Sequence, residues 1–213
     1  MSSVNLSQPT SRNIRSSILS PGKVSREEAE EAVRTMILWL GDDPLREGLL
    51  DTPARVVRAF EEWFSGYRLK PEEILSMTFE EVEGYAEPVT LRGIQFESYC
   101  EHHMAPIIGV VHISYIPDRK VVGLSKLARI VDLYAKRLQV QEKLTAQIAN
   151  TVQAVLNPKG VAVMISAEHQ CMSTRGVLKH GVDTITTQYT GEFSLDKSRQ
   201  SQFVKLVTSG ISR

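Results

Sequence analysis

The order of apolar patterns in the second half of the chain most limits its fold. Two stretches between about Glu87 and Ile116 have the alternation typical of strands, and Gly93 within the first favours a bulge. Two helical patterns follow, which begin at Ser125, expected to cap its helix, and at about Gln141. Two more strands are predicted at residues 161–167 and 184–193, and a last helix opens at Asp196.

This strand-strand-helix-helix-strand-strand order predicts an α+β fold. We expect a four-stranded antiparallel ββααββ sheet that carries helices on one face. The two edges of such a sheet are open, and open edges often pair with another subunit.

A helical region precedes the sheet. Ser25 and Glu28 form a capping box, and Gly41 ends the first helix. Thr52 and Pro53 are typical of a second helix start. A short third helix is predicted at residues 71–77. We therefore divide the chain into a tail at residues 1–24, a helical region at 25–83 and a sheet domain at 84–213.

The first 24 residues contain no acidic residue and are rich in serine. That composition overlaps with an organelle transit peptide, and it describes a disordered tail equally well. We expect a disordered tail.

Charge and cysteine content exclude several classes of function. The 25 basic and 25 acidic residues cancel, so no global field favours nucleic acid or an anionic membrane, and neither partner is expected. The apolar runs are far shorter than the roughly 20 residues that span a bilayer. Two cysteines are too few for a disulfide framework, which favours a reducing, cytoplasmic location.

Both cysteines lie beside histidines. Cys100 precedes His102 and His103, and His169 is two residues before Cys171. Thiolate and imidazole are ligands that Zn²⁺ prefers, and two cysteines with one histidine leave a fourth position open, as in catalytic sites. The alternative is that these are small buried thiols and ordinary core histidines. The coincidence of two pairs favours the metal.

Spacing does not decide whether His102 or His103 is the ligand, because neighbours on an extended segment point to opposite sides. The other histidine would be free for proton transfer. His169 would lie beside the metal as a second acid/base or as a substrate contact. For His112 and His180 a structural or surface role is expected.

The chain resembles GTP cyclohydrolase I from about residue 25 to its end. The Cys-Glu-His-His and Gln-Val-Gln-Glu segments are together highly specific. The matching stretches are residues 51–55, 98–117, 123–129, 139–145, 169–172 and 175–176.

The resemblance implies the tunnelling fold, which has the same ββααββ order, and a homo-oligomer, usually a decamer of two pentamers, with active sites shared between subunits. It implies conversion of GTP to 7,8-dihydroneopterin triphosphate with release of formate, the first step of pterin and folate biosynthesis. Cys100, His103 and Cys171 would be the zinc ligands, while His102 and His169 would handle protons.

The same resemblance implies the substrate contacts. Glu142 would read guanine, whose N1–H and N2–H₂ donors suit a carboxylate, with Gln141 beside it. Family members commonly have lysine where this chain has Arg58, so the charge is kept and the donor geometry differs. The triphosphate would be bound by Ser125, Lys126, Arg129, Arg175, Arg55 and Arg58.

Two other functions are compatible with parts of the pattern. A zinc-stabilised assembly protein without turnover would lack acid/base or phosphate-binding groups, and these are all present here. Another tunnelling-fold pterin or deazapurine enzyme would lack the paired cysteine-histidine motifs. The residues favour the cyclohydrolase over both.

Overall fold

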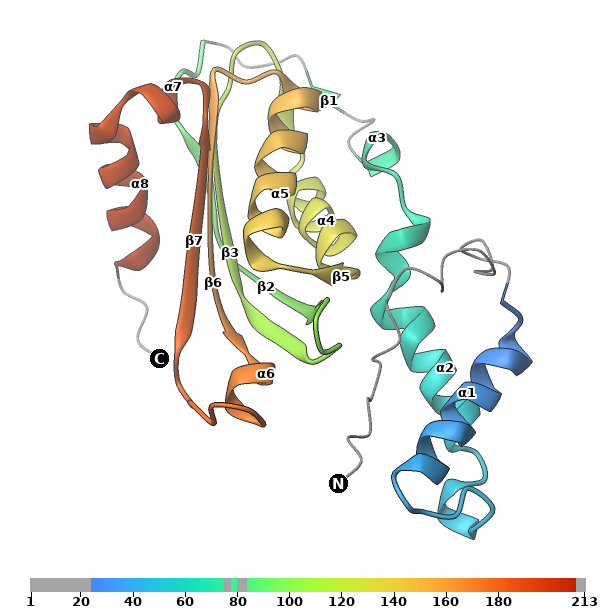
Figure 1. The fold of residues 1–213 in the computed structure, drawn as a ribbon. Coiled ribbons are helices and arrows are strands. Elements are labelled where there is room, and N and C mark those ends of the chain that lie inside the picture. The colour runs from blue at the N-terminus through green and yellow to red at the C-terminus, as the bar shows by residue number, and fades with distance from the viewer. Residues whose placement is uncertain (1–23, 75–77, 80–83, 210–213) are drawn as a thin grey trace, which may run out of the picture. The chain divides into compact units, whose positions relative to one another are not determined.

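The computed structural model describes residues 24–74, 78–79 and 84–209 (Figure 1). Apart from Val24, the tail predicted for residues 1–24 lies outside these ranges. The chain forms two compact units, residues 1–59 and 60–213. The division into a helical region and a sheet domain at residue 83 stays a prediction.

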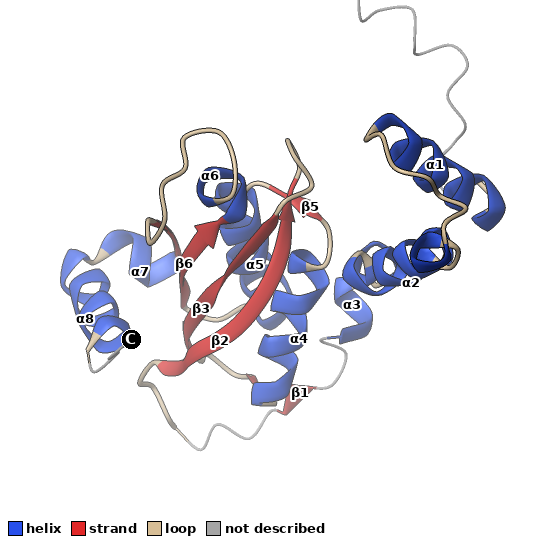
Figure 2. Cartoon of the chain, turned by 90° about the horizontal axis from the view of Figure 1, so that it is seen from below, coloured by secondary structure: helices blue, strands red, loops and turns tan. Residues whose placement is uncertain are grey.

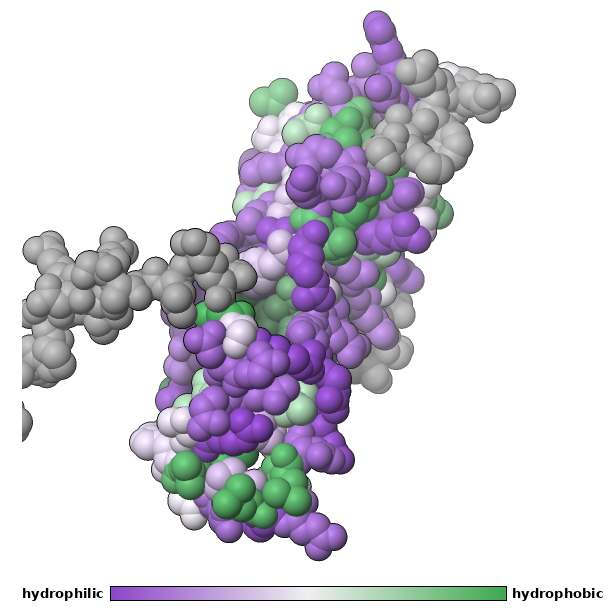
Figure 3. Space-filling model, turned by 90° about the vertical axis from the view of Figure 1, so that its right-hand side faces the viewer, coloured by the Kyte–Doolittle hydropathy of each residue, from purple (hydrophilic) through white to green (hydrophobic). Residues whose placement is uncertain are grey.

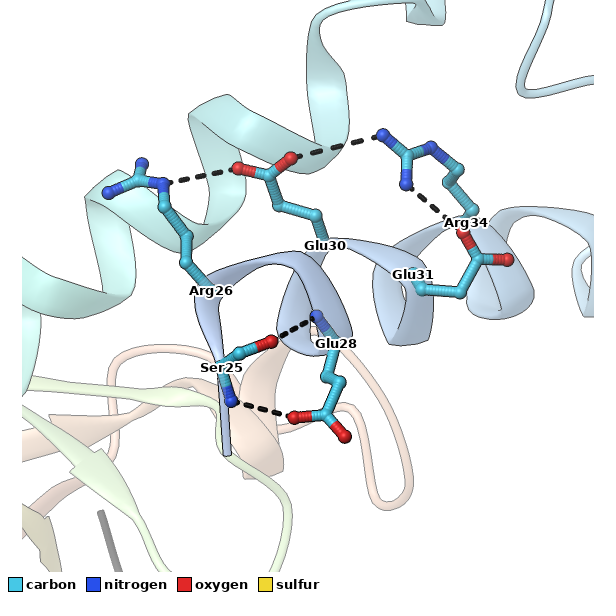
Figure 4. Close-up of polar contacts among 6 residues, drawn as sticks. All are labelled: Ser25, Arg26, Glu28, Glu30, Glu31 and Arg34. Carbon is cyan, nitrogen blue, oxygen red and sulfur yellow. Dashed lines mark hydrogen bonds and ion pairs between the residues drawn. The ribbon is translucent and has the colours of Figure 1, made fainter. Parts of the chain in front are cut away.

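The first unit contains α1 (Arg26–Trp39), the 3-10 turn η1 (Glu47–Leu49) and the start of α2 (Thr52–Trp63). The predicted capping box is present: Ser25 Oγ accepts from the Glu28 N–H at 3.1 Å, and the Glu28 carboxylate accepts from the Ser25 N–H at 2.8 Å (Figure 4). Each of these two bonds satisfies a backbone N–H that would otherwise lack a partner at the start of the helix. Gly41, at a φ of 91°, follows the end of this helix as predicted.

Several large apolar side chains of the first unit are exposed. Trp39 is 77% exposed and Leu45 is 75% exposed. Figure 3 shows apolar patches interrupting a mainly hydrophilic surface on the side that it draws. Exposed apolar side chains that gather into a larger patch are typical of protein interfaces.

The second unit is built on a five-stranded sheet in the order β5-β2-β3-β6-β7. Its four long strands pair antiparallel, whereas β5 pairs in parallel with the end of β2. A register shift between Leu91 and Ile94 confirms the bulge predicted at Gly93. The strands are β2 (Val89–Cys100), β3 (Pro106–Ile116), β5 (Leu138–Gln139), β6 (Gly160–His169) and β7 (Asp183–Thr190).

Two helices, α4 (Leu124–Ala135) and α5 (Gln141–Leu156), cover one face of the sheet, as Figures 1 and 2 show. Their apolar sides, including Leu127, Ile130 and Ile148, form the main core with β3 and β6. The order β2-β3-α4-α5-β6-β7 confirms the predicted tunnelling fold, although the sheet has five strands, with β5 in addition to the four expected.

The C-terminal helices α7 (Gly191–Leu195) and α8 (Lys197–Thr208) lie on the opposite face of the sheet (Figure 1). Phe193, Phe203 and Val207 fill a smaller core there. Asp196 caps α8, as predicted, by accepting from the N–H groups of Ser198 and Arg199. The remaining elements are η2 (Ser65–Arg68), α3 (Pro71–Ile74), β1 (Thr78–Phe79), β4 (Val121–Val122) and α6 (Gln170–Ser173).

Two local predictions were wrong. Ser125 does not cap α4, because the N-cap is Gly123 and Ser125 is already the second helical residue. The last strand ends at Thr190 rather than Phe193. Gly191 adopts a φ of 52° and packs so tightly that a Cβ would lie 2.1 Å from the Lys159 carbonyl oxygen. The chain therefore turns there into α7.

Among the described residues, no helix is both long enough and apolar enough to cross a membrane.

The close approach of β3 to β6 yields the first prediction. A Cβ at Gly109 would lie 2.3 Å from the Ser166 carbonyl oxygen, whereas one at Gly123 would meet nothing nearer than the Lys126 Cγ at 4.0 Å. We expect Gly109→Ala to lower the free energy of unfolding by about 2–3 kcal/mol. Gly123→Ala, the matched control, should change it by about 0.5 kcal/mol or less. Urea denaturation measures both, and equal effects would contradict the proposed steric cause.

Candidate active site

The end of β2 and the turn after it carry the first cysteine-histidine pair. Cys100 is buried, while His102 and His103 are exposed in the turn. The Cys100 N–H donates to the Ala105 carbonyl at 2.8 Å, and Met104 adopts a φ of 53°. These contacts make a tight turn that leads directly into β3.

The second pair reaches the same place through β6. The antiparallel register sets His169 opposite Ile107, near the start of β3, and α6 begins at the next residue. Cys171 therefore lies beside the turn that carries Cys100. Sheet pairing thus brings the two sequence motifs together.

Cys100, His103 and Cys171 form a group that could hold a metal ion, with their ligand atoms all within 4.8 Å of one another. A tetrahedral zinc ion with sulfur ligands at about 2.3 Å needs donor atoms about 3.8 Å apart, so the group fits with small shifts. Burial and the neighbouring Cys100 raise the pKa of the Cys171 thiol. A divalent cation would offset the repulsion between two thiolates, so the donor chemistry also fits.

The two adjacent histidines of the turn have different surroundings. His103 belongs to the metal-ligand group, and the Arg175 guanidinium donates to its Nε2 at 3.0 Å. His102 instead places Nδ1 at 3.6 Å from the Cys100 Sγ. The two rings therefore take separate positions, and His103 is the one that lies with the two cysteines.

His169 is fixed by a buried amide. Its Nε2 lies 2.8 Å from the Gln141 Oε1, and Gln141 Nε2 donates to the Thr184 carbonyl at 2.8 Å. Because the amide N–H₂ is directed at Thr184, the amide oxygen faces the ring, and His169 Nε2 is the donor. Burial lowers the pKa of His169, and the Glu142 carboxylate opposes that effect. The hydrogen bond places a proton on Nε2, and the lowered pKa favours the neutral ring, in which Nδ1 is an acceptor.

These residues surround one pocket of about 270 Å³. Glu142 is exposed in the first turn of α5. Sequence reasoning missed Gln139, although this residue lies within one of the stretches that match the family. Gln139 is buried, and its Nε2 donates to the Tyr134 carbonyl at 2.9 Å. The lining residues are Cys100, His102, His103, Gln139, Val140, Gln141, Glu142, His169 and Cys171.

Three of the residues predicted to bind phosphate lie outside this pocket within the second unit, whereas Arg175 contacts His103 beside it. Ser125, Lys126 and Arg129 are on the first turns of α4 and are not among the described residues that line the pocket. The helix α4 starts near the end of β3, and its axis is about 18 Å long before the chain reaches β5. Arg55 and Arg58 belong to the first unit, where Arg55 pairs with Asp51 at 3.2 Å.

The two remaining histidines have no part in this pocket as the described residues define it. His112 is buried, and its Nδ1 accepts from the Gly93 N–H of the bulge at 3.1 Å. Burial lowers its pKa, which fits a neutral acceptor. His180 is exposed in a loop. Both positions agree with the structural or surface roles expected.

Comparisons with known proteins agree on one family. The family model described as GTP cyclohydrolase I matches residues 29–208. GTP cyclohydrolase 1 of Maricaulis maris is 57% identical over 185 residues, which cover 87% of this chain and 90% of that protein. GTP cyclohydrolase 1 of Brucella anthropi is also 57% identical over 185 residues, which cover 87% of each chain.

The metal-ligand group makes a direct prediction. The purified protein should hold about one zinc ion per chain, as expected for one group of three protein ligands. Cys171→Ser should lose that ion and keep its helical circular dichroism, because the thiol is only partly buried. His180→Ala, at an exposed histidine outside the group, is the control. Elemental analysis that finds full metal in Cys171→Ser would contradict the assignment.

Proposed function

The chain belongs to the GTP cyclohydrolase I family, and on that premise we propose that it converts GTP to 7,8-dihydroneopterin triphosphate, with release of formate, in a zinc-dependent reaction of pterin biosynthesis. The observation that carries the proposal is the pocket that joins a thiol-imidazole-thiol group to two further histidines and an exposed carboxylate.

Cys100, His103 and Cys171 would hold the ion. Two thiols and one imidazole favour zinc over hard cations such as Mg²⁺, which prefer oxygen ligands. When bound, zinc supplies a Lewis acid that lowers the pKa of a water molecule toward neutrality for hydrolysis at the purine C8. A neutral imidazole has a single acceptor nitrogen, so the hydrogen bond from Arg175 to His103 Nε2 would be given up when the ring takes the ion, which would free Arg175 for the substrate.

The two other histidines would move protons. His102 lies beside Cys100 in an exposed turn, where its ring can reach a bound purine and protonate the ring nitrogen that leaves. His169 is held by Gln141 in the neutral form with Nδ1 as acceptor, and it can take a proton during the second hydrolysis that frees formate.

The base would be recognised at the start of α5. Glu142 lines the pocket, and its carboxylate can accept from both guanine N1–H and N2–H₂. Gln141 is proposed as a neighbouring substrate contact, and its amide also holds His169. A site built to satisfy these two donors discriminates strongly against a base that lacks them.

The phosphates would be bound between subunits of a homo-oligomer, for which we propose the decamer. Within one chain, the length of α4 separates Ser125 and Lys126 from the metal-ligand group, which supports a site completed by a neighbour. The exposed apolar side chains of the first unit also support an assembly. Phosphate contacts are proposed for Ser125, Lys126, Arg129, Arg175, Arg55 and Arg58.

Replacing His102 separates metal binding from chemistry. His102→Ala should keep zinc and lose turnover by about 10²-fold or more, because a proton-transfer group is removed while the three ligands stay. His103→Ala, its neighbour, should instead lose zinc. Formate release and metal content measured on the same samples check both, and the reverse pattern would mean that the two roles are exchanged.

A shared site predicts complementation. Cys171→Ser and Lys126→Ala should each be nearly inactive as pure oligomers. When the two are unfolded together and refolded as a mixture, some intact metal groups should meet intact phosphate-binding residues, and part of the activity should return. Cys171→Ser mixed with His102→Ala is the control, because both changes lie in one half of the site. Hybrid oligomers that recover no activity would place the whole site in one chain.

A further inference from the structure

The short strand β5 connects the two halves of the pocket. It consists of Leu138 and Gln139, which pair in parallel with Tyr99 and Cys100. The Glu101 N–H, in the metal-binding turn, donates to the Gln139 carbonyl at 3.0 Å. Two residues after Gln139, α5 begins with Gln141 and Glu142. The position of β5 therefore affects the metal ligands and the proposed guanine contacts together.

Two residues of pairing are too few to fix a strand firmly, and further contacts to β5 come from η2. The Tyr67 hydroxyl accepts from the Leu138 N–H at 3.1 Å. The Gly66 N–H donates to the Lys136 carbonyl at 3.1 Å. A Cβ at Gly66 would lie 2.3 Å from the Leu133 carbonyl oxygen, so this close approach requires glycine.

Arg137, immediately before β5, is held on several sides. Its Nε donates to the Gly66 carbonyl at 3.0 Å, and a terminal nitrogen donates to the Leu69 carbonyl at 3.5 Å. Its Cζ lies 5.8 Å from the centre of the Tyr67 ring and 5.2 Å from that of Tyr134. A planar guanidinium can make all these contacts at once, whereas the point charge of a lysine cannot.

We propose that Tyr67 and Arg137 are positioning residues for the reaction, which fix β5 and thereby set the metal-binding turn and the start of α5 relative to each other. The inference rests on the proposed function. Neither residue is among those that line the pocket, so both act through the backbone of β5. Small displacements of reacting groups cost large factors in rate, which is why such a support matters.

The test uses Arg137→Lys and Tyr67→Phe in the full-length protein. Tyr67 is 59% exposed, so Tyr67→Phe removes one hydrogen bond and leaves the core intact even if Arg137→Lys folds poorly. The matched control is Arg92→Lys. Arg92 also donates to two backbone carbonyls, those of Leu206 and Ser209, but it ties down the end of α8 instead of β5.

Amide hydrogen exchange of the metal-free protein is the first measurement. Both test variants should exchange faster in the peptides that cover residues 98–104 and 138–144, whereas Arg92→Lys should exchange faster near α8. The dissociation constant for zinc should rise by about tenfold in Arg137→Lys and by a smaller factor in Tyr67→Phe. The KM for GTP should rise in both, and Arg92→Lys should change neither constant.

The results separate this inference from the proposed function. A wild-type protein that binds no zinc or releases no formate from GTP would overturn the proposed function. An active wild type, with test variants whose exchange, zinc affinity and KM match those of Arg92→Lys, would overturn the positioning role alone. Faster exchange at β5 with weaker zinc binding and a higher KM supports it.

Discussion

The antiparallel pairing of β3 with both β2 and β6 is the constraint on which the candidate site depends. Tyr99 pairs with Pro106 on one side of β3, and Ile107 pairs with His169 on the other. The end of β2 and the end of β6 therefore meet at the start of β3. Gly109 keeps β3 close enough to β6 for this register, because any side chain there would meet the Ser166 carbonyl. Two thiols far apart in the sequence become neighbours through backbone geometry alone.

The part of the polar pocket floor around Gln141 is stable in the core because its hydrogen bonds are satisfied, whereas the buried Oε1 of Gln139 has no partner among the described residues. Gln141 is only 1% exposed, and its amide bonds His169, the Thr184 carbonyl and the Thr186 hydroxyl. Thr145 donates to the Gln141 carbonyl at 2.7 Å. Loss of one partner would leave a buried polar group unpaired, which costs about 1–3 kcal/mol. The same network sets which nitrogen of His169 carries the proton, so core packing and acid/base chemistry share one set of contacts.

Sequence patterns predicted the elements that have local signals. The capping box at Ser25, the bulge at Gly93 and the cap at Asp196 each depend on residues within a few positions. The prediction failed at Ser125, because a serine early in a helix has the same pattern whether or not it is the cap. The strand β5 was missed, since two residues have no periodicity and the partner is distant in sequence. The buried role of Gln141 likewise depends on long-range contacts that a helix start does not reveal.

The location of β5 also bears on how subunits could assemble around the proposed site. It covers the edge of β2 only at Tyr99 and Cys100 in the pairing that the described residues show, so residues 89–98 keep a long edge without a strand beside it. At the other edge of the sheet, β7 has an exposed Ile185. Unpaired edges favour strand addition by another copy. Because β5 ends the free edge beside the metal-ligand group, a strand of a neighbouring copy added along β2 would stop at the pocket and leave it open. A single short strand can thus keep the pocket accessible within one chain and limit how far an added strand extends toward it.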